Sequence, residues 1–194
     1  MPDCNPELVL PPWIKEFTAE HCSVLFSEKD RMDLAIELSR KNVQHKTGGP
    51  FGAAVFEQLS GRLVAVGVNL VVRSNCSYNH AEMVALAIAE YRLARYTFNS
   101  PDLPAHELVT SSEPCAMCFG AIIWSGIKRL VCGAYTADVE NAGFDEGPKP
   151  DNWTEELEKR GIVVVTGVSR FKASSVIHHY IAEGGIIYNG HPRQ

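Results

Sequence analysis

Hydrophobic residues recur along this chain at helical spacings in some segments and at strand spacings in others. Residues 28–45 carry an apolar stripe at intervals of three and four residues, and Ser27 with Asp30 forms a weak variant of the capping box in front of it. Gly48 and Gly49 follow the stripe. This pattern predicts a helix over 28–45.

The next segment, FGAAVFEQLSGRLVAVGVN, is rich in Val and Ala on both sides of Gly61, which predicts a β-hairpin. Residues 80–95 combine strong helix formers with an apolar stripe, and they predict a second helix. Helices that alternate with strands indicate an α/β protein whose sheet is covered on both faces. The remaining expected elements are a strand at HELVTSSE (106–113), a cysteine-containing helix, a strand at KRLVCGA (128–134), a charged helix, a strand at GIVVVTGV (161–168) and a helix over about 173–182.

The length of 194 residues and the 45% hydrophobic content favour one domain over residues 1–194. Four prolines interrupt the first twelve residues, so residues 1–20 are expected to form a Pro-rich N-terminal arm. The sequence has no signal peptide pattern and no apolar run approaching 18 residues, which predicts a cytoplasmic protein without a membrane span. A net charge of −5 gives no general attraction to a phosphate backbone, so long nucleic acid is not an expected partner.

Two of the six cysteines lie close together in SSEPCAMCFGAIIWSG. In a reducing compartment such a pair indicates metal binding or redox chemistry rather than a structural disulfide. Cys115 and Cys118 are three residues apart, so a helix would place both on nearly the same face. Pro114 suits the first turn of that helix, and the positive end of a helix stabilises a thiolate.

The segment NHAEMVALA provides the residues that distinguish a metal site from a redox pair. His80 lies at the start of a predicted helix and, with Cys115 and Cys118, makes a set of three zinc ligands that leaves a fourth position for water. Zinc would give a hydroxide nucleophile near neutral pH, and Glu82 would then be free to carry a proton to a leaving amine. The implied reaction is hydrolytic deamination.

A non-catalytic zinc-binding module is the alternative from another functional class, because structural zinc sites normally use four protein ligands. Cys76 and Cys132 are the possible fourth ligands. Cys132 lies inside an expected strand, where packing as a small hydrophobic residue is the ordinary role. Cys76 lies in the loop before His80 and stays open as a ligand.

The motifs H-A-E and P-C-A-M-C together match the zinc nucleobase deaminase signature. The chain resembles the cytidine-deaminase superfamily over roughly residues 28–135, and it is more closely similar to the bacterial guanine deaminases through GGPFGAAVF, SSEPCAMCFGAIIWSG and GFDEGP. The resemblance implies a three-layer α/β/α sandwich with a five-stranded mixed sheet. It also implies a zinc-dependent homodimer that converts guanine, a small purine base, to xanthine and ammonia.

The choice of substrate depends on polar groups beyond the zinc site. Guanine presents its N1–H and its 2-amino group as adjacent donors, which a carboxylate accepts well. The motif GFDEGP offers Asp145 and Glu146 in a Gly- and Pro-rich loop, where an acidic turn facing solvent is the ordinary alternative. The resemblance favours Glu146 as a second catalytic carboxylate and Asp145 as a substrate contact, although related motifs read F-D-D and leave this division open.

The resemblance also implies further contacts with the base. Asn69 corresponds to a residue that hydrogen-bonds the base, Ala81 lies within the H-A-E motif, and Phe51 is a candidate for stacking. Residues 184–194 resemble a C-terminal tail that closes the site with an aromatic side chain such as Tyr188, in its own subunit or across a dimer. The alternative substrates are guanosine, an aminotriazine such as ammeline, a cytosine-type base and tRNA adenosine, the last of which would need a basic surface for RNA.

Overall fold

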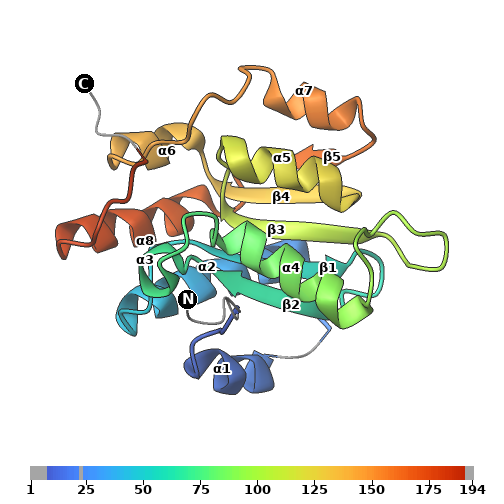
Figure 1. Ribbon diagram of the computed structural model, residues 1–194, viewed down its shortest axis with the longest axis horizontal. Coiled ribbons are helices and arrows are strands. Elements are labelled where there is room, and N and C mark those ends of the chain that lie inside the picture. The colour runs from blue at the N-terminus through green and yellow to red at the C-terminus, as the bar shows by residue number, and fades with distance from the viewer. Residues whose placement is uncertain (1–7, 22–23, 191–194) are drawn as a thin grey trace, which may run out of the picture.

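The computed structural model describes residues 8–21 and 24–190, and it contains a five-stranded mixed sheet between two layers of helices (Figure 1). The strands are β1 (Gly52–Glu57), β2 (Leu63–Val68), β3 (His106–Ser112), β4 (Arg129–Ala134) and β5 (Val163–Val165). Their order in the sheet is β2-β1-β3-β4-β5, with β1 antiparallel to β2 and β3, and with β3, β4 and β5 parallel. The predicted three-layer α/β/α architecture is confirmed.

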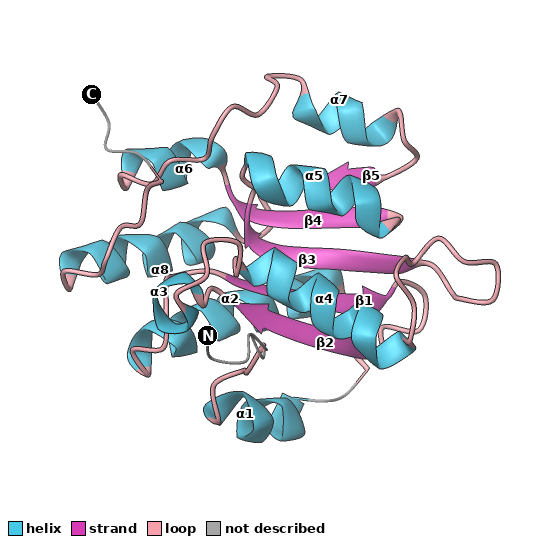
Figure 2. Ribbon diagram, in the orientation of Figure 1, coloured by secondary structure: helices cyan, strands magenta, loops and turns pink. Residues whose placement is uncertain are grey.

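Helices cover both faces of the sheet, as Figure 2 shows. They are α1 (Trp13–His21), α2 (Glu28–Gln44), α3 (Val71–Ser74), α4 (Ala81–Leu93), α5 (Ala116–Ser125), α6 (Thr136–Asn141), α7 (Trp153–Glu158) and α8 (Arg170–Ala182). Ala53 and Val55 of β1 join the apolar core beneath α4, α5 and α7, whereas Ala54 and Phe56 join the core beneath α1, α2 and α8. This alternation follows from the two-residue period of a strand and buries β1 on both faces.

Helix α2 begins where the sequence predicts. Ser27 is the N-cap, and its hydroxyl accepts a hydrogen bond of 3.0 Å from the backbone N–H of Asp30. The buried face of α2 carries Arg31, which pairs with Glu107 of β3, and Glu107 also accepts a hydrogen bond of 2.7 Å from Arg129 of β4. Because Glu107 is fully buried, these two arginines compensate its charge and fasten α2 to the sheet.

The predicted hairpin is formed by β1 and β2, and Gly61 lies in its turn. Gly61 has a φ of +70°, and a Cβ added there would lie 2.4 Å from the carbonyl oxygen of Leu25. Both the backbone conformation and this close approach therefore require glycine.

Several elements differ from the expectation. Helix α1 occupies part of the segment expected as an arm, and its buried Ile14 and Phe17 pack into the core beneath α2. Strand β5 is three residues long instead of eight, since it pairs only with β4 at the edge of the sheet and Gly167 then turns the chain with a φ of +75°. Helix α8 begins at Arg170, and the short helices α3 and α6 were not expected. No helix in the described part of the chain has the length and apolar character needed to cross a bilayer.

Candidate metal centre and catalytic cavity

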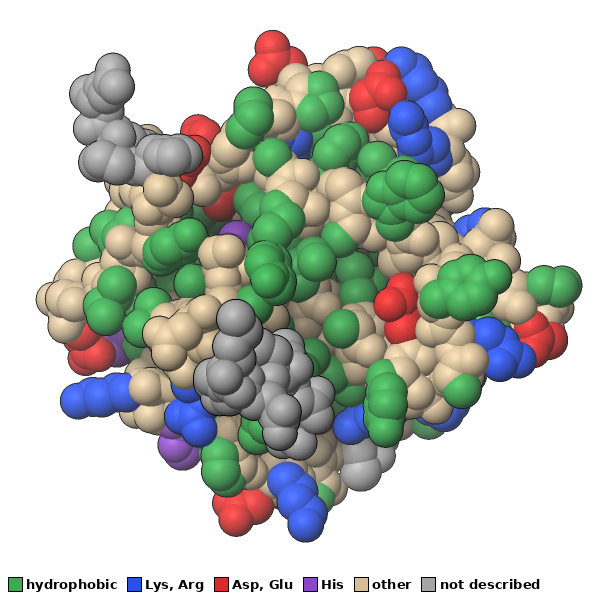
Figure 3. Space-filling model, in the orientation of Figure 1, with side chains coloured by type: hydrophobic (Ala, Val, Ile, Leu, Met, Phe, Trp, Pro, Cys, Tyr) green, Lys and Arg blue, Asp and Glu red, His purple; other side chains and the backbone are tan. Residues whose placement is uncertain are grey.

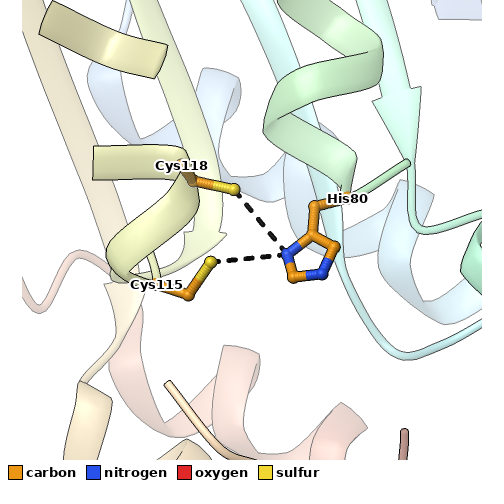
Figure 4. A group of neighbouring side chains, drawn as sticks. All are labelled: His80, Cys115 and Cys118. Atoms are coloured by element: carbon orange, nitrogen blue, oxygen red, sulfur yellow. Dashed lines mark hydrogen bonds between the residues drawn. The ribbon is translucent and has the colours of Figure 1, made fainter. Parts of the chain in front are cut away.

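The N-termini of α4 and α5 bring the three predicted ligands together. His80 is the N-cap residue of α4, Cys115 is the N-cap residue of α5, and Cys118 lies in the first turn of α5. The Nδ1 atom of His80 lies 3.5 Å from the Sγ atom of Cys115 and 3.7 Å from that of Cys118 (Figure 4). The ligand atoms of all three residues lie within 4.8 Å of one another.

This spacing fits a tetrahedral zinc ion. With Zn–S and Zn–N bonds of the usual lengths, a tetrahedral angle separates sulfur and nitrogen by about 3.6 Å. Both measured nitrogen–sulfur distances lie close to that value. Contacts with the Cys118 and His80 side chains lower the pKa of Cys115 to about 4, against the opposing effect of burial. Cys115 is therefore a thiolate at neutral pH, the form that binds a metal.

Three protein ligands form the group, and the described residues offer no fourth. Among residues 8–21 and 24–190, the cluster that could hold a metal ion consists of His80, Cys115 and Cys118. Cys132 is fully buried in β4 and packs in the apolar core, as its position in a strand predicts. Cys76 does not belong to the cluster, so the described residues form a site with the open position of a catalytic zinc centre.

Glu82 lies beside this group, in the first turn of α4. Its side chain lines the same cavity as His80 and Cys115, and the residue is only 5% exposed. Burial, together with the charge of Cys115, raises the pKa of the Glu82 carboxyl group. A carboxyl group in this position holds a proton more readily than a solvated glutamate does, as a proton carrier requires.

Asp145 and Glu146 are neighbours in the loop after α6, but they differ in burial. Glu146 is 8% exposed and lines the cavity, and burial, Cys115 and Glu82 raise its pKa to about 8. Asp145 also borders the cavity, but it is exposed, and its Oδ1 atom accepts a hydrogen bond of 2.9 Å from the backbone N–H of Gly147. The loop therefore buries Glu146 and uses the Asp145 carboxylate to stabilise its own turn.

Asn69 lies just after β2 and is fixed from two sides. Its backbone oxygen accepts a hydrogen bond of 2.9 Å from the side chain of Asn42, and its Oδ1 atom accepts one of 3.3 Å from the N–H of Val71. A Cβ on Gly48 would lie 1.8 Å from the Asn69 carbonyl oxygen, and one on Gly49 would lie 3.2 Å from Oδ1. The two glycines thus allow the chain to pack directly against Asn69, which lines the cavity.

The remaining predicted contact residues also border the cavity. Phe51 is half-buried, and its ring meets Phe144 edge-on at a centroid distance of 5.2 Å. Ala81 is buried beside His80 at the start of α4. Tyr188 is 44% exposed and reaches the cavity from the C-terminal tail. The structure therefore gathers all the predicted substrate contacts around one cavity.

The C-terminal tail lies against the cavity of its own chain. Tyr180 of α8 donates a hydrogen bond of 2.8 Å to the carbonyl oxygen of Ile186. Further along, Asn189 accepts a hydrogen bond of 2.8 Å from the N–H of Asp145 and donates one of 3.0 Å to the carbonyl oxygen of Gly143. Residues 184–190 are thus tied to the loop that carries Glu146, and residues 191–194 of the predicted tail lie outside the described residues.

Sequence reasoning missed several residues near the cavity. Glu113 and Ser112 line it, although both stand in the same motif as the two cysteines. Tyr180 and Ile186 also contribute to its wall. Nothing in the spacing of Tyr180 connects α8 to α4 and α5, so no local signal could have found it. Ile186 lies in the C-terminal tail that the resemblance already implied as a cover for the site.

Comparisons with known proteins agree with this geometry. The family model described as "Cytidine and deoxycytidylate deaminase zinc-binding region" matches residues 27–134. A solved structure of the guanine deaminase from Nitrosomonas europaea is 48% identical to this chain, with a TM-score of 0.88. The match covers 94% of this chain and 98% of that protein's chain. A solved structure of a variant of the protein NE0047 in complex with 8-azaguanine is 47% identical, with a TM-score of 0.89. This match covers 94% of this chain and 99% of the other.

The guanine deaminase of Bacillus subtilis strain 168 is 38% identical over 112 residues, which is 58% of this chain and 67% of that protein. The matched family region contains the three metal ligands and Glu82. The chain therefore belongs to the cytidine and deoxycytidylate deaminase family of zinc-binding proteins.

Proposed function

We propose that this protein is a zinc-dependent guanine deaminase, which hydrolyses guanine to xanthine and ammonia. The observation that carries the proposal is the meeting of a three-ligand metal centre with two buried carboxylates, Glu82 and Glu146, in one cavity. The similarity to guanine deaminases across nearly the whole chain supports guanine as the substrate.

His80, Cys115 and Cys118 would hold the zinc ion. Zinc, when bound, supplies Lewis-acid chemistry that lowers the pKa of a water in its fourth position to about 7. Glu82 would hold a proton inside the cavity and deliver it toward the leaving amine. Its burial supports this role, because bulk water does not compete for a proton held on a buried side chain.

Guanine would be recognised through its donor edge and its flat face. The ionised form of Glu146 would accept hydrogen bonds from N1–H and the 2-amino group. Its pKa of about 8 lets the same group also hold a proton near neutral pH, which supports a second catalytic role. Asn69 offers its side-chain amide to acceptor atoms of the base, since its Oδ1 atom is already engaged by Val71. Phe51 packs against the ring, and Tyr188 covers it from the tail.

The test is ammonia release from guanine, guanosine, ammeline, cytosine and adenosine by the zinc-loaded protein. We expect guanine to be the preferred substrate. Preference for cytosine or adenosine would refute the substrate assignment and leave a zinc deaminase. A non-catalytic zinc module would release no ammonia from any of them.

We further propose that the protein is a homodimer in the cytoplasm. Hydrophobic side chains gather on the face presented by α4 and α5 (Figure 3). Trp124 of α5 and Tyr91 of α4 are 85% and 87% exposed, which is unusual for large apolar side chains unless a partner covers them. A second copy of this chain is the proposed partner. Sedimentation velocity should show a dimer, and Trp124→Glu should shift it to a monomer; a monomeric wild-type protein would contradict the proposal.

A further inference from the structure

Lys149 lies in a hydrogen-bond network of side chains that includes neither the metal ligands nor the side chains of Glu82 and Glu146. Its Nζ atom donates to the carbonyl oxygen of Pro114 at 2.7 Å and to the Oγ1 atom of Thr136 at 2.9 Å. The ammonium group also lies 4.6 Å from the ring centroid of Trp153, within the range of a cation–π interaction. These three contacts come from the segment before α5, the start of α6 and the start of α7. Lys149 therefore joins three parts of the chain.

The network continues to a buried carboxylate. The backbone N–H and the hydroxyl of Thr136 each donate a hydrogen bond of 2.8 Å to Glu113 Oε2. A threonine hydroxyl has one proton, which it gives to Glu113, so its oxygen is free to accept from Lys149. Glu113 and Pro114 directly precede Cys115. The network thus surrounds the backbone that leads into the metal centre.

The same lysine is close in sequence to the second cavity carboxylate. The backbone N–H of Lys149 donates to the carbonyl oxygen of Gly147 at 2.9 Å, and the carbonyl oxygen of Glu146 accepts a hydrogen bond of 2.8 Å from the N–H of Ala116. Gly147 has a φ of +69°, and a Cβ there would lie 3.1 Å from the Ala116 side chain. The loop is therefore pressed against the first turn of α5 and held there at two points, by Ala116 and by Lys149.

We propose that Lys149 is a positioning residue, which fastens the loop 143–149 to the entrance of α5 and so sets the place of the Glu146 carboxylate relative to Cys115. This inference rests on the proposed function, in which Glu146 contacts the substrate. Because Glu146 is anchored through its backbone, the direction of its carboxylate follows the path of the loop. A displacement of a reacting group by about 1 Å can cost about 10²-fold in rate.

The first test compares Lys149→Met with Lys159→Met. Lys159 is an exposed lysine at the end of α7, where it pairs with Glu156 at 2.6 Å, so its loss is a matched control. We expect Lys149→Met to lower kcat for guanine by about 10²-fold, while zinc content and the unfolding temperature stay near those of Lys159→Met. Lys149→Arg keeps the charge and the donors and should recover part of the rate. Unchanged kcat in Lys149→Met, or loss of zinc from it, would overturn the proposal.

A second test asks whether Lys149 acts through Glu146. If it does, adding Lys149→Met to a Glu146→Gln protein should lower the residual kcat little further, because the group to be positioned has already been lost. If the two substitutions instead lower kcat independently, so that their effects multiply, Lys149 does not act through Glu146.

Hydrogen exchange measured by mass spectrometry separates this inference from the proposed function. Lys149→Met should speed the exchange of amides in the loop 143–149, whereas Lys159→Met should not. If the wild-type protein fails to deaminate guanine but the loop exchanges faster in Lys149→Met, the proposed function fails and the anchoring role of Lys149 stands. Equal exchange in the wild-type and Lys149→Met proteins would overturn that role even if guanine is deaminated.

Discussion

Replacing Glu82 by glutamine removes the proposed proton carrier and changes little else. Glutamine has the same number of heavy atoms as glutamate, so the first turn of α4 can keep its packing. The three ligand atoms come from other residues, so zinc should remain bound at about one ion per chain. The change therefore separates proton transfer from metal binding.

The burial of Glu82 determines how large a loss of kcat we expect from Glu82→Gln. General acid–base catalysis contributes about 10²- to 10⁴-fold, which corresponds to about 2.7–5.5 kcal/mol of transition-state stabilisation at 25 °C. Glu82 is only 5% exposed, so buffer molecules have little access with which to replace the lost carboxylate. We therefore expect the loss of kcat to fall in the upper part of this range.

The assay measures ammonia release from guanine, zinc content by atomic absorption and thermal unfolding in the same preparation. Glu90→Gln is the matched control, since Glu90 lies on the same helix and is partly buried, but it does not line the cavity. It should deaminate guanine at the wild-type rate. Near-wild-type turnover of Glu82→Gln with zinc retained would refute the proton-transfer role and would favour a different carrier.

Three other predictions concern the second carboxylate, the metal and pH. Glu146→Gln should lower guanine turnover at least about tenfold with zinc retained, as expected for a lost charged hydrogen bond. Asp145→Asn should have a smaller effect, because Asp145 is exposed and bonds within its own turn, whereas Glu146 is buried. Equal effects of the two substitutions would contradict this reasoning. Cys118→Ala leaves two ligands, so zinc content and activity should fall together in dialysed protein, and retained zinc would contradict the assigned ligand set.

Burial lowers the pKa of His106 below its ordinary value of 6.5, so in acid the folded protein binds fewer protons at this ring than the unfolded chain does. The free energy of unfolding should therefore fall as the pH drops through about 6.5. His106→Phe should make the unfolding temperature change less between about pH 8 and pH 5. If the variant shows the same pH dependence as the wild type, His106 is not the group responsible.

The sequence by itself determined the chemistry of the metal centre. His80, Cys115 and Cys118 stand at the starts of two helices that the apolar periodicity of the sequence predicts. The two short motifs together offer a complete set of ligands for a catalytic zinc ion and match the zinc nucleobase deaminase signature, and this match predicted that the residues meet. The strand segments were predicted from their composition, which differs from that of the helices that separate them, whereas their assembly into one five-stranded mixed sheet was what the resemblance implied.

Other features depended on contacts between distant segments. Nothing local distinguishes Asp145 from Glu146, and the different burial of the two carboxylates arises because the loop packs against α5. Helix α1 was missed because the prolines before it indicated an extended arm, although Ile14 and Phe17 lie three residues apart, on one helical face; a helix this short is stabilised by burying that face, here against α2.

The contacts of Lys149 could not be predicted from the sequence either. In the sequence it is a single lysine in a Gly- and Pro-rich loop, which is typical of a solvated surface residue. Its partners Pro114, Thr136 and Trp153 lie 35, 13 and 4 residues away along the chain. Only the tertiary fold, which packs the loop between α5, α6 and α7, brings these groups within bonding distance.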